Sequence, residues 1–195
     1  MKILKTDQEN FNQLVEKTVK AIKNGRVIVC PTDTVYGLIA DATNKKAVEK
    51  IFKIKKRPKN KPVPIFIKDI SAAKKLAKIN EKQEAFLKSV WPGKVTIVLN
   101  RKKSRLYGVD KKTIALRIPK YGLLLSLAKQ LNCPLTGTSA NISGRPVSTR
   151  IKEVIKQFQN QKQKLDLVID AGNLKPAKPS KVIDLTGSKP KILRK

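Results

Sequence analysis

The spacing of apolar residues along this chain changes repeatedly between two periods, which predict helices and strands in alternation. Apolar residues that recur every three or four positions form one face of a helix. This period predicts helices at 8–24, across Val48, Ile51 and Phe52, and at 71–79, 81–90, 121–131 and 151–158. We expect Gly25 to end the first helix and Pro92-Gly93 to follow the fourth, since these are stop signals. Helix 121–131 is apolar almost all round, which predicts deep burial.

Short runs of β-branched and other apolar residues predict the strands. They lie at 26–30, 63–67, 94–99, 113–118, 133–138, 165–170, 181–185 and 192–194. The stretch 31–41 is rich in turn residues and is interpreted as a loop. Because strands and helices interleave throughout, we expect an α/β fold. No repeat or linker divides the chain, so residues 1–195 are expected to form a single domain.

Length and composition fit a folded protein of the cytoplasm. The 195 residues are 40% hydrophobic, yet no apolar run is long enough to span a bilayer, and the N-terminus is too polar for a signal peptide. Cys30 and Cys133 lie far apart in apolar segments. We expect them to be small core residues and to form neither a disulfide framework nor a metal site.

The chain is strongly basic, with 44 Lys plus Arg against 14 Asp plus Glu and a formal net charge of +30. A field of this strength attracts polyanions such as RNA. The lysines are scattered along the chain, however, and solvated helix faces account for them equally well. Composition alone leaves both interpretations open.

Histidine is absent from the sequence. This excludes Ser-His-Asp and Cys-His nucleophile systems, and zinc sites that need imidazole. Any catalysis must therefore rest on positioning, cationic side chains, backbone donors or a metal held by oxygen ligands.

Three polar segments adjoin predicted strands, where α/β proteins tend to bind ligands. Residues 31–38 offer threonine hydroxyls around an aspartate, and residues 55–61 form a proline-bounded basic loop whose Arg57 can grip phosphate or carboxylate. Residues 136–146 carry small hydroxyl residues and glycines that let backbone amides approach an anion, without a Walker motif. The alternatives are a plain turn for residues 31–38, a solvated basic patch for 55–61, and a helix cap or an ordinary loop for 136–146.

Arg117 is a fourth candidate, because it lies inside an apolar run and needs an anionic partner, either an internal carboxylate or one from a ligand. From these patterns alone, the chain is an α/β protein that binds a small anionic ligand such as a nucleotide.

In this order, the segments resemble the YrdC/TsaC family of threonylcarbamoyl-AMP synthases. The resemblance rests on PTDTVYGL at 31–38, KKRP at 55–58, WPG at 91–93, ALRIP at 115–119, SANISG at 139–144 and PSKVID at 179–184. Each motif is short, but six matches in order cover nearly the whole chain.

The resemblance implies a twisted mixed sheet with flanking helices and a concave basic site. It implies that the protein converts L-threonine, bicarbonate and ATP into threonylcarbamoyl-AMP and pyrophosphate. It also implies that the adenylate passes to a tRNA-modifying transferase complex and that the protein contacts tRNA or other RNA. The residues it assigns to catalysis are Lys55, Arg57, Ser139 and Asn141. ATP would also contact Lys61, Thr113 and Arg194, and threonine would contact Thr34, Arg117 and Ser180. Mg²⁺ is expected on phosphate and water, with no metal ligand from the protein.

The sequence departs from the family pattern at several points. Many relatives carry Glu at the position of Asp33, and some carry His at the position of Phe66. The chain ends at Lys195, so we expect neither a further C-terminal domain nor closure by an interdomain linker. It lacks the zinc-finger cysteines of the hydrogenase-maturation carbamoyltransferases that share this domain.

A function of another class remains open: a non-catalytic RNA-binding or ribosome-assembly protein of the same fold. Salt-sensitive RNA binding that ignores ATP and threonine would favour it, whereas competition by ATP would favour the enzyme.

Overall fold

Six helices and eleven strands alternate in the computed structural model, which describes all residues from Met1 to Lys195. The helices are α1 (Phe11–Lys23), α2 (Lys45–Lys55), α3 (Ile70–Leu76), α4 (Glu81–Val90), α5 (Gly122–Leu131) and α6 (Ile151–Phe158). The strands are β1 (Lys2–Lys5), β2 (Ile28–Cys30), β3 (Gly37–Ile39), β4 (Ile65–Phe66), β5 (Val95–Asn100), β6 (Thr113–Arg117), β7 (Leu135–Thr136), β8 (Thr138–Ser139), β9 (Leu167–Asp170), β10 (Lys181–Asp184) and β11 (Lys191–Arg194). The α/β class predicted from the sequence is confirmed.

Local side-chain chemistry fixes the ends of the helices. Asn10, Asn44, Asp69 and Asn80 cap α1, α2, α3 and α4, each accepting a hydrogen bond from a backbone N–H of the first turn. Gly25 follows α1 at a φ of 71°, and its N–H bonds to Ile22 O while the next N–H reaches back to the last turn. This is the Schellman pattern that a glycine after a helix favours.

The strands form two mixed sheets, where the sequence analysis expected one. The first sheet has the order β1-β9-β2-β3-β8, and its first three strands are parallel. The second has the order β11-β10-β5-β6-β4-β7, with parallel and antiparallel pairs in turn. The predicted strand 133–138 is divided between them, because β7 pairs with β4 and β8 pairs with β3.

Two strands were not predicted. Lys2–Lys5 pairs with β9 although only Leu4 is buried, so the segment has too few apolar positions to signal a strand. Gly37–Ile39 lies in the stretch interpreted as a loop, and it pairs with both β2 and β8. Its pairing depends on strands far away in the sequence, which no local pattern contains.

The first sheet is covered by helices on both faces. Ile28, Cys30 and Ile169 pack in one cluster with apolar residues of α1 and α5. The alternate positions Val29 and Val168 pack in another cluster with α2 and α6. This burial on both faces accounts for the continuous apolar runs of β2 and β9. Both cysteines are free; Cys30 is buried and Cys133 packs at the cluster margin, as predicted.

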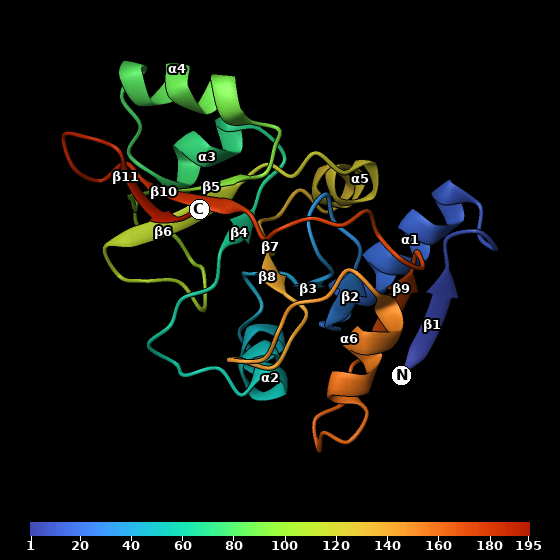
Figure 1. The fold of residues 1–195 in the computed structure, drawn as a ribbon. Coiled ribbons are helices and arrows are strands. Elements are labelled where there is room, and N and C mark those ends of the chain that lie inside the picture. The colour runs from blue at the N-terminus through green and yellow to red at the C-terminus, as the bar shows by residue number, and fades with distance from the viewer.

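The second sheet has helices on one face only, and this asymmetry creates the site. Ile97, Leu99 and Leu116 pack in one cluster with residues of α3 and α4, and Figure 1 shows these two helices on the same side of β5, β10 and β11. Strand residues alternate between faces, so Thr96 and Arg117 point to the other side. There they line a cavity.

Candidate functional site

A cavity of about 280 Å³ lies against the helix-free face of the second sheet. Its wall combines that face with the loop after β2, the basic loop after α2, the segment around β7 and β8, and the segment that enters β10. Six residues assigned from the sequence line it: Thr34, Arg57, Arg117, Ser139, Ser180 and Arg194. Segments far apart along the chain thus converge on one hollow.

The remaining four assigned residues lie outside the lining. Lys55 and Asn141 are buried directly behind Ser139. Lys61 is exposed, and its backbone carbonyl accepts a hydrogen bond from Arg57 Nε. Thr113 stands at the start of β6, where its N–H and hydroxyl both donate to Asp110 Oδ1. The structure therefore brings Lys55 and Asn141 next to the cavity, and places the side chains of Lys61 and Thr113 beyond its wall.

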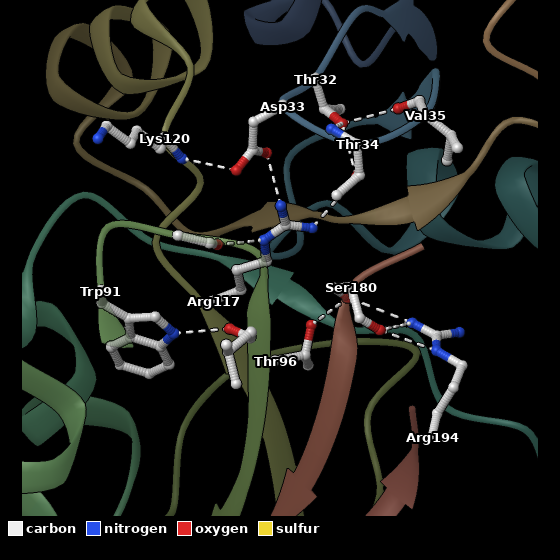
Figure 2. A network of polar contacts seen from close by, with 12 residues as sticks. Thr32, Asp33, Thr34, Val35, Trp91, Thr96, Arg117, Lys120, Ser180 and Arg194 are labelled. Carbon is white, nitrogen blue, oxygen red and sulfur yellow. Dashed lines mark hydrogen bonds and ion pairs between the residues drawn. The ribbon is translucent and has the colours of Figure 1, made fainter. Parts of the chain in front are cut away.

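Arg117 has an internal carboxylate partner. Its Nη2 lies 2.5 Å from Asp33 Oδ1, and the two side chains are only 3% and 8% exposed. Arg117 Nε donates to Gly93 O at 2.9 Å, and Nη1 to Thr34 Oγ1 at 3.4 Å (Figure 2). Burial lowers the pKa of Arg117, and Asp33 opposes that shift, so the guanidinium stays charged. Three of its five N–H groups are engaged, which leaves two for a ligand.

The loop after β2 holds its two threonine hydroxyls with local hydrogen bonds. Thr32 Oγ1 donates to Val35 O and accepts from the backbone N–H of Thr34. The hydroxyls of Thr32 and Thr34 are 3.0 Å apart. Both side chains are buried, so the loop presents a fixed polar corner beside Arg117.

A second polar group is formed by Thr96 on β5, Ser180 just before β10 and Arg194 on β11. Ser180 Oγ is 2.8 Å from Thr96 Oγ1, and Arg194 donates to both the carbonyl and the hydroxyl of Ser180 (Figure 2). The pairing of β10 with β11 brings Arg194 to this position. Arg194 thus has only neutral oxygen partners, and its charge is available to an anion.

Arg57 also lacks a carboxylate partner. Its Nε donates to Lys61 O and its Nη2 to Pro62 O, both at 2.8 Å, so the guanidinium folds back across the basic loop. Burial lowers the pKa of Arg57, although the group stays protonated. The charge of Arg57 therefore faces the cavity without compensation.

Lys55 organises the loop between Ser139 and Arg145. Its ammonium donates to the carbonyls of Ser139 and Asn141 and to Asn141 Oδ1. Ser139 Oγ donates to the same Oδ1 at 2.6 Å, and Asn141 Nδ2 donates to Arg145 O, also at 2.6 Å. Burial, followed by the charge of Arg57, lowers the pKa of Lys55 to about 7. The side chain therefore holds the loop in shape and does not project into the cavity.

The charges around the cavity favour an anionic ligand. Three arginines line it and no carboxylate does. Arg117 is paired with Asp33, so two guanidinium charges remain uncompensated. Without a lining carboxylate, the residues present do not form a magnesium site. No group of three or more Cys, Asp or Glu residues that could hold a metal ion occurs in the structure.

Sequence reasoning missed several residues of the wall. Thr96 carried no motif signal, because its role arises only when β5 pairs with β10. Phe66 packs its ring under Arg117, with 5.6 Å from the ring centroid to Cζ. A Cβ on Gly137 would lie 2.5 Å from Phe66 Cε1, so only glycine fits beside this ring.

None of the helices is long and apolar enough to cross a membrane.

Comparisons with known proteins agree with this architecture. The Sua5/YciO/YrdC family model, described as "Telomere recombination", matches residues 20–195. The chain is 37% identical over 189 residues to a Methanocaldococcus jannaschii protein provisionally named threonylcarbamoyl-AMP synthase, covering 97% of this chain and 88% of that protein. It is 31% identical to the threonylcarbamoyl-AMP synthase of Bacillus subtilis, covering 97% of this chain and 55% of the relative.

A solved structure is similarly close. The crystal structure of Pyrococcus abyssi Sua5 complexed with L-threonine superposes with a TM-score of 0.86 at 33% identity. The match covers 99% of this chain and 56% of the Sua5 chain. The chain thus spans nearly all of the shorter relative, and little more than half of the longer ones.

Proposed function

The chain belongs to the Sua5/YciO/YrdC family, and from this premise we propose that it is an L-threonylcarbamoyladenylate synthase. L-threonine, bicarbonate and ATP give threonylcarbamoyl-AMP, pyrophosphate and water. The curated relatives named above carry this activity in their names. The observation that carries the proposal for this chain is the cavity, which has two unpaired guanidiniums and a separate polar corner around Arg117.

Threonine occupies the corner formed by Thr34, Arg117 and Ser180. Two free N–H groups of Arg117 can receive the α-carboxylate as a charge-assisted pair. The Asp33 carboxylate fixes the guanidinium while leaving those donors in place. Buried hydroxyls of Thr34 and Ser180 are the partners for the threonine hydroxyl, and valine has no hydroxyl to bond with them.

ATP occupies the side of Arg57, Ser139 and Arg194. Arg57 and Arg194 supply the positive charge for its phosphates, since neither has a carboxylate partner. Lys55 and Asn141 act from behind by fixing the loop that carries Ser139. Lys61 and Thr113 remain predicted ATP contacts, which requires that the nucleotide extend past the cavity wall.

The reaction needs little covalent help from side chains. The threonine amine captures CO₂ derived from bicarbonate to form a carbamate. One carbamate oxygen then attacks the α-phosphorus of ATP, and the bond from that phosphorus to the pyrophosphate oxygen breaks. Guanidiniums aimed at the phosphate oxygens stabilise the developing charge, and a rigid wall holds the reactants in line.

The remaining parts of the proposal concern partners. Mg²⁺ would have phosphate and water oxygens as its ligands, because the cavity lining offers no carboxylate. The adenylate would pass to a tRNA-modifying transferase complex, bringing the protein close to RNA. Two unpaired cysteines support a cytoplasmic location.

Pyrophosphate release from ATP tests the proposal. With Mg²⁺ and bicarbonate present, release should depend on L-threonine and fall by at least about tenfold when valine replaces it. A mass spectrum of the product should show the threonylcarbamoyl adduct of AMP. Folded protein that releases pyrophosphate at the same rate with and without threonine would refute the assignment.

A further inference from the structure

A second cavity, of about 560 Å³, lies outside the reaction cavity, between α2 and the loop that contains Tyr107 and Gly108. We call it the α2 groove. It is lined by Lys45, Val48, Glu49, Phe52, Lys53, Arg57, Lys59, Tyr107 and Gly108. Arg57 is the only residue of the groove that the proposed reaction uses.

The helical repeat explains why these side chains gather. Lys45, Phe52 and Lys53 recur at spacings of seven and eight residues along α2, which puts them on one face. The core of α2 uses a neighbouring face with Ile51 and Ile54. Phe52 is therefore an aromatic ring at the margin of the core, with Lys53 next to it in the sequence and Lys45 about two turns earlier.

Close packing fixes the opposite wall of the groove. Gly108 has a φ of 68°, and a Cβ there would lie 2.8 Å from Val48 Cγ1 and 2.9 Å from Phe52 Cε2. The N–H of Tyr107 donates to Ala42 O, and Gly108 O accepts from the N–H of Val63. The loop cannot lift from the helix without losing these contacts, so Tyr107 and Phe52 line a preformed groove.

The charges of the groove are unbalanced. Four cations line it against the single carboxylate of Glu49. Lys45, Lys53 and Lys59 form no ion pair, whereas Lys50 on another face of α2 is paired with Asp166 at 2.7 Å. The groove thus combines two half-buried aromatic side chains with unpaired cations. An unpaired nucleotide has a flat base that can stack on the aromatic side chains and a phosphate that can bind the cations.

We propose that the α2 groove binds single-stranded RNA, with a base stacked on Tyr107 and Phe52 and phosphates near Lys45, Lys53 and Lys59. Unpaired bases expose the faces that stacking needs, whereas a duplex buries them. The choice of RNA over DNA rests on the proposed function, because a tRNA receives the product of that reaction. Arg57 lines both the groove and the reaction cavity, so RNA would bind next to the nucleotide.

Fluorescence anisotropy with a labelled single-stranded RNA of about 12 nucleotides tests the proposal. Tyr107→Leu should weaken binding by about 5- to 100-fold, because it removes a stacking ring. Lys53→Gln with Lys59→Gln should weaken binding and reduce the salt slope by about 1.4, as two single-strand phosphate contacts are lost. Lys20→Gln with Lys23→Gln on α1 is the matched control, since it removes the same charge from exposed, unpaired positions elsewhere.

Three results would each overturn the proposal. The two lysine double variants could weaken RNA binding equally, which would indicate diffuse electrostatic attraction only. The Kd could be unchanged in Tyr107→Leu, or duplex RNA of the same sequence could bind with equal affinity. Threonine-dependent pyrophosphate release, measured without RNA, shows that each variant is folded and active. If that release is intact while groove-dependent binding is absent, this inference fails and the proposed function stands. If the release lacks threonine dependence while groove binding persists, the proposed function fails instead.

Discussion

Asp33 and Arg117 form a buried ion pair at the boundary of the cavity, with 2.5 Å between Oδ1 and Nη2. Asp33 also accepts from the backbone N–H of Lys120 through Oδ2 at 3.1 Å. It therefore joins the loop after β2 to the end of β6. The sequence left open whether the anionic partner of Arg117 is an internal carboxylate or one from a ligand. In the structure the internal carboxylate of Asp33 neutralises Arg117, and a ligand carboxylate would be a second anion on the same guanidinium.

Asp33→Asn tests this role. The amide keeps the shape but leaves the Arg117 charge buried without a counter-ion, so the free energy of unfolding should fall by about 3–5 kcal/mol. Urea unfolding measures the change. The KM for threonine should rise more than the KM for ATP, because the misplaced group belongs to the threonine corner. Asp33→Glu preserves the charge and is the control; a loss of stability equal to that of Asp33→Asn would show that charge is not the cause.

Arg57→Ala separates catalysis from folding. Arg57 donates only to carbonyls of its own loop, so its removal should cost less than about 1 kcal/mol of stability. Loss of its charge at the phosphates should lower kcat/KM by about 100-fold or more. Steady-state pyrophosphate release and thermal unfolding measure the two effects.

Lys61→Ala is the comparison for Arg57→Ala within the same loop. Its exposed side chain should matter less to turnover, since only its backbone carbonyl contacts Arg57. Parallel losses of activity and stability in Arg57→Ala would contradict a catalytic role for that residue.

Much of the fold could be predicted because its signals are local. The bounds of α4 and α6 match the sequence expectation to the residue. A capping box of Asn80 and Gln83 marks the start of α4, and α6 buries Ile151, Val154 and Phe158 at helical spacing. The division into two sheets could not be predicted, because Gly137 separates the two-residue strands β7 and β8 and only distant partners decide their pairing. The residues of a short apolar run do not indicate which sheet the strand joins.

The site divides in the same way. Arg57, Arg117 and Ser139 stood out because a basic loop bounded by prolines, a charge in an apolar run and a cluster of hydroxyls are each visible in a linear sequence. The contacts of Lys55 were not visible: the resemblance assigned this residue to catalysis, and the structure shows it buried against the loop carbonyls of Ser139 and Asn141. Such contacts join residues more than 80 positions apart, and only the fold creates them.

Gly137→Ala should disturb threonine binding through Phe66. The new Cβ would lie 2.5 Å from Phe66 Cε1, so the ring beneath Arg117 must move. We expect kcat/KM for threonine to fall by about tenfold, in the range of a small displacement at a positioned group. Gly187→Ala meets no atom within 4 Å and should behave as the original protein. Adding Phe66→Leu should restore part of the activity of Gly137→Ala; simple addition of the two losses would show that the residues do not interact.

The lowered pKa of Lys55 predicts that stability rises with pH above neutrality. Lysine titrates near 10.5 when unfolded and near 7 in the folded protein. Between these values the unfolded chain binds the extra proton, so raising the pH favours folding, by up to about 1.4 kcal/mol per pH unit. Below pH 7 both states are protonated and the contribution no longer changes. Urea unfolding at pH 7.0, 7.75 and 8.5 measures the slope. The thiols of Cys30 and Cys133 have pKa values raised by burial, and they oppose the trend above about pH 9. Lys55→Met lacks the titrating group and should lose this rise while being less stable overall, since the carbonyls it served are left unpaired. The same slope in both proteins would mean that Lys55 stays charged in the fold and that its three oxygen partners outweigh the cost of burial.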